Sequence, residues 1–521
     1  MIPVFTPNIG EEELRNVTDA IKTNWVSSRG EYLKKFEDKF AEYCGSKYGV
    51  TTTSGTTALH LALATLNIGK GDEVIVPNFT MISSALAVCY TGATPVFIDA
   101  EEETGNIDIK KIEEKITPKT KAIMPVHIYG HPCDMDEINA LAKKYRLFVI
   151  EDAAEAHGAE YKGKKCGSIG DIGCFSFYAN KLITTGEGGM IVTNNKEIYE
   201  KAQSLKDLAF GKEKKYYHKE IGFNYRLTNV QAAIGLGQME KIELFLNKKI
   251  NNARLYSSLL KDVNGVKIPI EKPYVKNSYW MYAIRFTDDF KIKKDKIKKI
   301  LFEKGIDTRD FFIGMNEQPI FRNLQIGEEF PVSKKLSETG LYLPSGLDLT
   351  KKDIEYICEI IKEIQGGKKI INNIHEDLYK QILENMPVCC IDLIIHNASK
   401  VLLVYRKKEP SKDEWWFPGG RLCKNEKLKD AVIRKAYEET GLNVEIEKQT
   451  GVYDYFSDKS AFSDIKTGTH TPVIVYLVKI VDKNQEIKID LTNASYRWID
   501  KIEEGLDPYV KKVLKDSGVF G

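Results

Sequence analysis

Short apolar runs alternate with helix-like segments through the first third of the chain. Four or five consecutive apolar residues bounded by polar turns are typical of buried strands. The runs are EVIVP at 73–77, TPVFI at 94–98, AIMPV at 122–126 and LFVIE at 147–151. Apolar spacing over 11–23 and 33–44 predicts two helices before them. This alternation predicts an α/β fold with a mostly parallel sheet between helices.

The hydrophobic pattern changes near residue 370. Helical spacing after residue 351 ends at Gly366 and Gly367, and the polar run KKIINN follows. Two glycines followed by lysines at the end of an apolar helix are typical of a domain boundary. Since 521 residues are too many for one core, we expect two domains, 1–368 and 371–521.

Composition excludes several classes of protein. Apolar residues make up 42% and charged residues 29%, as in soluble globular proteins. A net charge of +2 gives no reason to expect nucleic acid, and no run approaches the ~18 apolar residues of a membrane span. The nine cysteines lack CxxC spacing, which argues against a disulfide framework or structural zinc. We expect a cytoplasmic protein without membrane contact.

A phosphate site is predicted in TTTSGTTALHLAL, residues 51–63. Ser54, Gly55 and Thr56 open a helix there. The free backbone N–H groups and the dipole of a helix N-terminus attract a phosphate. The alternative is an ordinary helix cap, for which serine is common.

Two charged residues are candidates for chemistry at the sheet edge. Lys181 lies between an apolar strand-like run and a glycine-rich turn in CFSFYANKLITTGEGGM, and Asp152 follows the fourth apolar run. Ligands of such sheets bind at the carboxyl ends of the strands. A nucleophilic lysine must be partly desolvated, because its ordinary pKa of about 10.4 keeps it protonated. The alternatives are a solvated lysine, one of 76 Lys and Arg, and a helix-capping aspartate.

Residues 1 to about 365 resemble the pyridoxal-phosphate nucleotide-sugar aminotransferases of fold type I, most closely the branch that forms GDP-perosamine. The segments that carry the resemblance are NWVSSRGEY, SGTTALHLAL, GDEVIVP, KAIMPVHIYG, CDMD, VIEDAAEAHGA, FSFYANKLITTGEGGMI and GFNYRLTNVQAAIGL. The resemblance implies a mixed, mostly parallel sheet between helices, with a small C-terminal α/β subdomain. It also implies transfer of an amino group from glutamate to the C4 ketone of GDP-4-keto-6-deoxy-mannose. A UDP- or dTDP-linked 4-keto sugar is the alternative substrate.

The same resemblance assigns residues to the cofactor. Lys181 becomes the residue that binds pyridoxal phosphate covalently and moves the proton, which argues against the related dehydratases that carry histidine there. Asp152 pairs with the pyridine nitrogen. The remaining assignments are Glu155 at the ring hydroxyl, Ser54, Gly55, Thr56 and Ser176 at the phosphate, and Asn224 from the other subunit of a homodimer. Two positions depart from the family: Met81 replaces an aromatic residue on the ring face, and 311–319 lacks a histidine of the sugar pocket.

The second predicted domain centres on WWFPGGRLCKNEKLKDAVIRKAYEETGL, residues 415–442. This segment resembles the Nudix box of α+β hydrolases, which binds a divalent cation against a diphosphate. The box requires Gly, five residues, Glu, seven residues and then Arg-Glu-x-x-Glu-Glu-x-Gly. The matching residues are Gly420, Glu426, Arg434, Lys435, Glu438, Glu439 and Gly441. The alternative is a solvated charged helix, which does not account for the glycine turn and the Glu426 spacing.

Lys435 stands where the box has an acidic residue. Residues 435, 438 and 439 share one helix face, where three carboxylates would hold hard cations. Because lysine removes one ligand, we expect one Mg²⁺, held by Glu439 with Glu438 and Gly420 beside it. Arg434 and Glu426 are expected to form a structural ion pair.

The flanking segments resemble the GDP-mannose mannosyl hydrolases, a Nudix branch with a reduced box. The segments are CIDLIIHN, the stretch around Arg406, WWFPGGR and ASYRWID. The resemblance implies that Asp392, Arg406 and Arg421 contact a GDP-sugar. Thr492 and Asn493 stand where these relatives carry a metal ligand and a candidate base, and neither side chain can act as a base. The second domain is therefore either a hydrolase or a module that binds a GDP-sugar without turnover.

Overall fold

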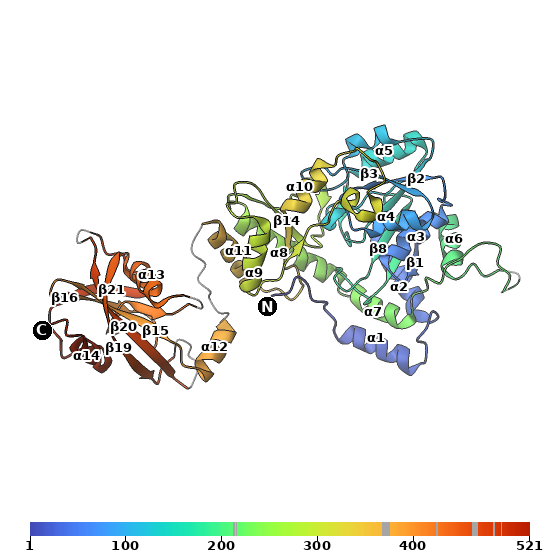
Figure 1. Cartoon of the computed structure of the whole chain (residues 1–521). Coiled ribbons are helices and arrows are strands. Elements are labelled where there is room, and N and C mark those ends of the chain that lie inside the picture. The colour runs from blue at the N-terminus through green and yellow to red at the C-terminus, as the bar shows by residue number, and fades with distance from the viewer. Residues whose placement is uncertain are drawn as a thin grey trace. The chain divides into compact units, whose positions relative to one another are not determined.

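The computed structural model divides the chain into two compact units, Met1–Lys368 and Lys369–Gly521 (Figure 1). It describes residues 1–521 except 212, 213, 215, 367–375, 424, 425, 461–466, 483, 484, 491 and 521. The boundary expected near residue 370, with Gly367 and the polar run after it, lies outside the described residues.

The first unit is built on a seven-stranded sheet, counted over the described residues, with the order β1-β9-β8-β5-β4-β2-β3. All its strands are parallel except β9, which is antiparallel to both neighbours. The strands are β1 (Tyr48–Thr52), β2 (Glu73–Pro77), β3 (Thr94–Ile98), β4 (Thr120–Ile123), β5 (Phe148–Asp152), β8 (Ile172–Ser176) and β9 (Gly189–Thr193). The predicted parallel sheet is confirmed. Two runs are shifted. The strand expected at 122–126 begins at Thr120 and ends at Ile123, before Pro125, which has no N–H for the ladder. The strand expected at 147–151 is Phe148–Asp152.

Helices cover both faces of this sheet (Figure 1). Val74 and Val76 of β2 pack in a cluster with α3 and α6, whereas Ile75, on the opposite face, packs with α5. The alternation is that of a strand buried on both sides. The helices up to the end of the sheet region are α1 (Glu11–Lys22), α2 (Glu31–Cys44), α3 (Gly55–Thr65), α4 (Ser83–Tyr90), α5 (Met135–Tyr145), α6 (Lys196–Lys206) and α7 (Asn229–Met239). Both predicted N-terminal helices are present.

A smaller α/β part follows, as expected for the subdomain. Its sheet has the order β10-β12-β14-β13, with β10 (Val266–Lys267), β12 (Tyr282–Phe286), β13 (Arg309–Asp310) and β14 (Gly340–Leu343). Its helices are α8 (Ile242–Leu260), α9 (Lys294–Glu303), α10 (Pro331–Thr339) and α11 (Lys351–Gln365). A third sheet joins β6 (Glu160–Tyr161), β7 (Lys164–Lys165) and β11 (Val275–Lys276). Short 3-10 helices are η1 (Ile109–Lys111), η2 (Glu113–Lys115), η3 (Ile128–Gly130), η4 (Met315–Glu317) and η5 (Pro319–Phe321).

The second unit is a mixed sheet between two helices. The order is β17-β16-β15-β20-β19, with β18 on β15 and β21 on β16. Leu393 and Ile395 of β15 pack towards α13, while Ile394 packs in the cluster with α14. The elements are α12 (Glu376–Asn385), β15 (Cys390–Asn397), β16 (Lys400–Arg406), β17 (Trp415–Trp416), β18 (Gly419–Arg421), α13 (Leu428–Thr440), β19 (Val444–Ser457), β20 (Thr469–Ile480), β21 (Asn493–Ile499) and α14 (Pro508–Ser517).

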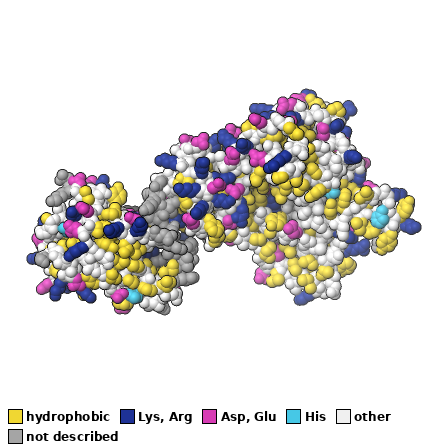
Figure 2. Space-filling view, in the orientation of Figure 1, with side chains coloured by type: hydrophobic (Ala, Val, Ile, Leu, Met, Phe, Trp, Pro, Cys, Tyr) yellow, Lys and Arg dark blue, Asp and Glu magenta, His cyan; other side chains and the backbone are white. Residues whose placement is uncertain are grey.

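The surface carries both signs of charge. On the face drawn in Figure 2, basic and acidic side chains are interspersed, in keeping with the net charge of +2. No helix in the described part of the chain combines the length and the apolar character that crossing a bilayer requires.

Candidate functional site

The parallel strands of the first unit deliver the candidate residues to one edge of the sheet. Asp152 is the last residue of β5 and Ser176 the last of β8, while Ser54 follows β1 by two positions. Because the carboxyl ends of parallel strands share an edge, side chains more than 100 positions apart in the sequence gather there.

The N-terminus of α3 lies against Ser176. Ser54 caps the helix, and its Oγ accepts a hydrogen bond of 3.2 Å from the Thr57 N–H. A Cβ atom built on Gly55 would lie 2.8 Å from the Ser176 Cβ, so only glycine fits between them. Thr56 Oγ1 donates to Ser83 Oγ at 2.8 Å. The helix N-terminus predicted from the Ser-Gly-Thr turn is therefore present and packed against β8.

Asp152 is buried, with 5% of its surface exposed, and each carboxylate oxygen accepts a hydrogen bond. Ser84 Oγ donates to Oδ2 at 2.8 Å, and the Ala154 N–H donates to Oδ1 at 3.2 Å. Burial raises the pKa of Asp152, and these two bonds oppose the rise. The carboxylate is held rigidly by α4 on one side and by its own loop on the other.

Lys181 lies in the loop between β8 and β9. Its Nζ is 3.8 Å from Glu155 Oε1 and 3.8 Å from the ring centroid of Trp280. Trp280 Nε1 donates to the Asn180 carbonyl at 2.8 Å, which fixes the indole beneath the amine. Burial lowers the pKa of Lys181, against the charges of Glu155 and Asp152. This is the desolvated amine that nucleophilic chemistry requires.

Glu155 is the carboxylate next to this amine. Its Oε2 accepts a 2.7 Å hydrogen bond from the Tyr129 N–H. Burial raises the pKa of Glu155 to about 7, although the Lys181 charge lowers it. Burial therefore favours the neutral form of both partners.

Two candidates from the sequence have exposed side chains. Met81 precedes α4 and is 47% exposed, with its Sδ accepting from the Ser83 N–H at 3.1 Å. Asn224 is exposed on the segment before α7, and its Oδ1 accepts from Arg226 Nε at 2.9 Å. Both side chains are accessible to a bound molecule.

Sequence reasoning missed Ser84 and Trp280. Ser84 lies in the first turn of α4, directly after the loop of Met81, and no motif of the sequence identified it. Trp280 lies 99 positions from Lys181, and no local sequence pattern predicts their contact.

Buried His127, Glu151 and Cys166 lie close enough together to hold a metal ion. Glu151, however, already accepts 2.7 Å hydrogen bonds from the N–H groups of Gly167 and Ile169, and its Oε2 lies 3.0 Å from His127 Nε2. With these bonds made inside the chain, the cluster is a satisfied structural network.

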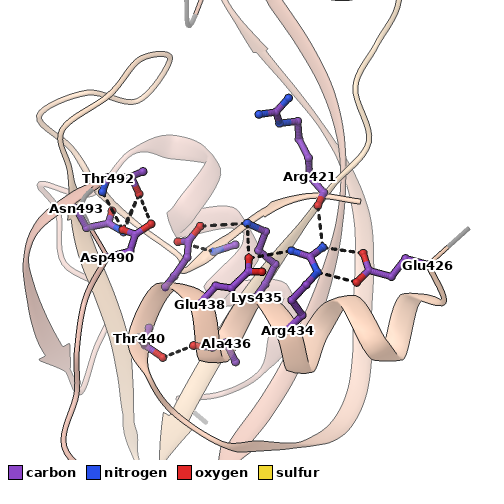
Figure 3. A network of polar contacts seen from close by, with 12 residues as sticks. Arg421, Glu426, Arg434, Lys435, Ala436, Glu438, Thr440, Asp490, Thr492 and Asn493 are labelled. Carbon is purple, nitrogen blue, oxygen red and sulfur yellow. Dashed lines mark hydrogen bonds and ion pairs between the residues drawn. The ribbon is translucent and has the colours of Figure 1, made fainter. Parts of the chain in front are cut away.

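In the second unit, α13 carries Arg434, Lys435 and Glu438 of the Nudix-like segment, and Glu426 lies just before this helix (Figure 3). Arg434 binds Glu426 through two parallel contacts, Nε to Oε1 and Nη2 to Oε2, each 2.7 Å. Both side chains are about nine-tenths buried. The predicted structural ion pair is confirmed.

Arg434 and Lys435 both contact Glu438. Its Oε2 accepts from Arg434 Nη1 at 2.9 Å and lies 3.2 Å from Lys435 Nζ. Glu439 lies 4.0 Å from the same ammonium and accepts from the Gly419 N–H at 3.1 Å. Burial raises the pKa of Glu439 to about 7, against the Lys435 charge. In this arrangement Glu438 and Glu439 do not fit a metal ion. The Lys435 ammonium lies near both carboxylates, and Arg434 already donates a hydrogen bond to Glu438.

The other candidates of this unit lie on neighbouring strands. Asp392 of β15 is buried and accepts from the Tyr509 hydroxyl at 3.0 Å; burial raises its pKa to about 6. Arg406, at the end of β16, pairs across the sheet with Asn493. Arg421 is exposed at the end of β18.

Thr492 and Asn493 both donate to one carboxylate oxygen, Asp490 Oδ1, at 2.7 and 2.8 Å (Figure 3). Asp490 in turn donates its N–H to the Glu439 carbonyl at 3.3 Å. This loop therefore lies beside the end of α13 without supplying a basic nitrogen.

Comparisons with known proteins agree with both halves of this description. Residues 387–514 match the model of the NUDIX domain. The chain is 44% identical over 370 residues to GDP-perosamine synthase of Escherichia coli O157:H7, covering 70% of this chain and 99% of that protein. It is 42% identical to GDP-perosamine synthase of Caulobacter vibrioides, covering 70% of this chain and 98% of that protein.

Solved structures give the same result for the fold of the first unit. An aminotransferase from Psychrobacter cryohalolentis matches with a TM-score of 0.67 and 34% identity over 70% of this chain and 98% of that one. DesV of S. venezuelae matches with a TM-score of 0.65 and 32% identity over 69% of this chain and 95% of that one. The family model that matches residues 7–362 is the DegT/DnrJ/EryC1/StrS aminotransferase family, and the chain belongs to it.

Proposed function

We propose that the first unit transfers an amino group from glutamate to the C4 ketone of GDP-4-keto-6-deoxy-mannose and forms GDP-perosamine. The observation that carries the proposal is the desolvated amine of Lys181, 3.8 Å from Glu155 at the carboxyl edge of the sheet. The choice of nucleotide and sugar is supported by the two GDP-perosamine synthases, which this chain matches over nearly their whole length.

The residues at this edge fit pyridoxal phosphate, the cofactor that membership of the family implies. The N-terminus of α3, with Ser54, Gly55 and Thr56, would hold the phosphate together with Ser176. The close packing of Gly55 on Ser176 supports this role, because a larger residue would separate the two phosphate contacts.

Three further side chains would orient the cofactor ring. Asp152 would pair with the pyridine nitrogen, Glu155 would contact the ring hydroxyl, and Met81 would pack on the ring face. The bound cofactor supplies an electron sink for the carbon that loses its proton. Rigid support from Ser84 and Ala154 favours Asp152 for its role, since its carboxylate has little freedom to turn away.

Lys181 would have two roles. It would bind the cofactor covalently between turnovers, and its amine would move the proton during turnover. The lowered pKa of Lys181 supports both roles, because an unprotonated amine is needed for each. Glu155, with a pKa of about 7, can hold that proton beside the amine.

A panel of nucleotide sugars tests this proposal. The protein is incubated with glutamate and GDP-, UDP- or dTDP-linked 4-keto-6-deoxy sugars, and the products are weighed by mass spectrometry. We expect an amino sugar chiefly from the GDP-linked compound. Lys181→Ala should lose turnover and the visible absorbance of the bound cofactor, whereas Lys164→Ala, on the exposed strand β7, should keep both. Repeated turnover by Lys181→Ala would refute the assignment.

We also propose a homodimer with shared active sites, in which Asn224 reaches the cofactor phosphate of the other subunit. The exposure of Asn224 supports this role. If Asn224→Ala and Lys181→Ala are mixed, each hybrid dimer has one site with both lesions and one with neither. Activity should therefore recover on mixing. No recovery, with subunit exchange demonstrated, would show that each site uses its own Asn224.

For the second unit we propose binding of a GDP-linked sugar, with Asp392, Arg406 and Arg421 as its contacts. The NUDIX match favours hydrolysis as a second candidate function, with one Mg²⁺ held by Glu439, and with Glu438 and Gly420 beside it.

Hydrolysis of this kind requires the Lys435 ammonium to move away from both carboxylates. Incubation with GDP-mannose and Mg²⁺ in oxygen-18 water tests it. Labelled free sugar or labelled phosphate would establish hydrolysis and identify the bond cleaved, whereas intact GDP-mannose leaves binding as the function.

A further inference from the structure

The ammonium of Lys435 lies among the groups that a metal ion would use. Its Nζ is 3.2 Å from Glu438 Oε2 and 4.0 Å from Glu439 Oε1. A Cβ atom built on Gly420 would lie 3.0 Å from both Nζ and Cε of Lys435, so the end of the lysine covers this glycine. The three groups that the sequence predicts as metal contacts therefore surround one side-chain cation, and Figure 3 shows the contact of Lys435 with Glu438.

The formal charge of the cluster equals that of a Nudix box with glutamate at position 435 and one bound divalent ion. Arg434 and Lys435 face Glu426, Glu438 and Glu439, which gives a formal charge of −1. A glutamate at position 435 would make the charge −3, and one divalent ion would return it to −1. Lysine in place of glutamate thus changes the charge by the same two units as the ion.

Two unused polar atoms lie on the strands next to this cluster. Among the described residues, Arg406 Nε and Asn493 Oδ1 are buried without a hydrogen-bond partner. Arg406 and Asn493 are paired across β16 and β21, and Asn493 is only 1% exposed. Its amide nitrogen donates to Asp490, whose N–H reaches the Glu439 carbonyl. Because buried polar atoms are rarely left unpaired, these two atoms indicate a ligand that supplies their hydrogen-bond partners.

We propose that Lys435 is the built-in cation of the second unit, which binds the diphosphate of a nucleotide sugar without a divalent metal. The inference rests on the proposed binding of a GDP-linked sugar by this unit. The Lys435 ammonium and the Arg406 guanidinium contact the diphosphate, as lysine and arginine do in other phosphate sites. Asn493 Oδ1 accepts from a hydroxyl or N–H of the ligand. No bond is made or broken in this step.

Manganese binding tests the metal half of the proposal without interference from the aminotransferase site. The probe is Mn²⁺ alone, measured by electron paramagnetic resonance on the full-length protein. The wild type should leave Mn²⁺ free, and Lys435→Glu should bind one ion per chain. Tight Mn²⁺ binding by the wild type that Glu439→Gln removes would overturn the proposal.

Calorimetric titration with GDP-mannose tests the ligand half. The wild type should bind equally well in EDTA and in Mg²⁺, whereas Lys435→Gln should lose at least about tenfold in affinity for the second-unit site in both buffers. Lys435→Arg should retain binding, which separates loss of charge from misfolding. Lys429→Gln, an exposed lysine on the same helix, is the matched control and should bind as the wild type does.

Two results would separate the failure of this inference from failure of the proposed function. Binding that Lys435→Gln leaves intact, and that disappears in EDTA and returns with Mg²⁺, overturns the built-in cation while nucleotide-sugar binding stands. If neither Lys435→Gln nor Arg406→Gln changes GDP-mannose binding in either buffer, the second unit does not bind this ligand and both proposals fail.

Discussion

Glutamine in place of Glu439 should stabilise the second unit at neutral and alkaline pH and leave its stability unchanged in acid. Burial raises the pKa of Glu439 from 4.5 to about 7 in the folded protein. A carboxyl group whose pKa is raised by folding stabilises the fold fully below pH 4.5, and this contribution is lost as the pH rises through about 7. Glutamine stays neutral and can still accept the hydrogen bond from the Gly419 N–H.

The size of the effect follows from the two pKa values. The pKa of Glu439 rises from 4.5 to about 7 on folding. At about 1.36 kcal/mol per pKa unit, this shift corresponds to about 3 kcal/mol of stability. The Glu439 side chain is 8% exposed, so solvent screens little of this energy. For a domain of this size, each kcal/mol shifts the melting temperature by about 2–4 °C. We therefore expect the transition of the second unit to rise by about 6–12 °C at about pH 8.

Scanning calorimetry of the full-length protein between about pH 4 and pH 8 measures the difference. Glu445→Gln, which removes an exposed carboxylate from β19 and with it an exposed ion pair to Lys479, is the control and should shift the transition far less at both ends of the range. Equal melting temperatures for wild type and Glu439→Gln at alkaline pH would refute the reasoning. A lower temperature for the variant would mean that the Lys435 contact stabilises the ionised carboxylate by more than its burial costs.

Other substitutions test the supports of each site. Ser84→Ala should lower kcat about tenfold or more, because a hydrogen bond to the charged Asp152 contributes about 1.5–3 kcal/mol. Steady-state kinetics measure kcat, and an unchanged value would contradict this role of Ser84. Arg434→Ala should destabilise the second unit by about 3–5 kcal/mol, because it removes both contacts of the guanidinium with the buried Glu426 carboxylate. Lys479→Ala breaks an exposed ion pair and should cost less than about 1 kcal/mol in the same urea unfolding experiment; equal losses for both variants would contradict the burial argument.

Local spacing accounts for the features that were predictable from the sequence. Runs such as EVIVP form strands because several adjacent β-branched residues suit a strand buried on both faces. The Ser54 cap needs only its own helix, and the Arg434–Glu426 pair follows from the fixed loop and helix of the Nudix-like segment. In each case a few neighbouring residues determine the result.

Contacts between distant segments were not predictable in this way. The position of Trp280 beneath Lys181 depends on how the later part of the first unit packs against the large sheet. The sequence identified Lys435 as a lost metal ligand, but it gave no sign that the ammonium would cover Gly420. That position depends on the reach of a long flexible side chain, which residue spacing does not specify.

The order of strands in the large sheet has a consequence for synthesis of the chain. β9 is the last of these strands to be made, yet it lies between β1 and β8 and pairs Thr52 with Gly189. Until β9 leaves the ribosome, β1 cannot join the sheet, so a nascent chain carries an unfinished strand edge that is exposed to aggregation. The same pairing joins the start of α3 to the loop of Lys181. Cofactor capture is therefore expected only after residue 193 has emerged.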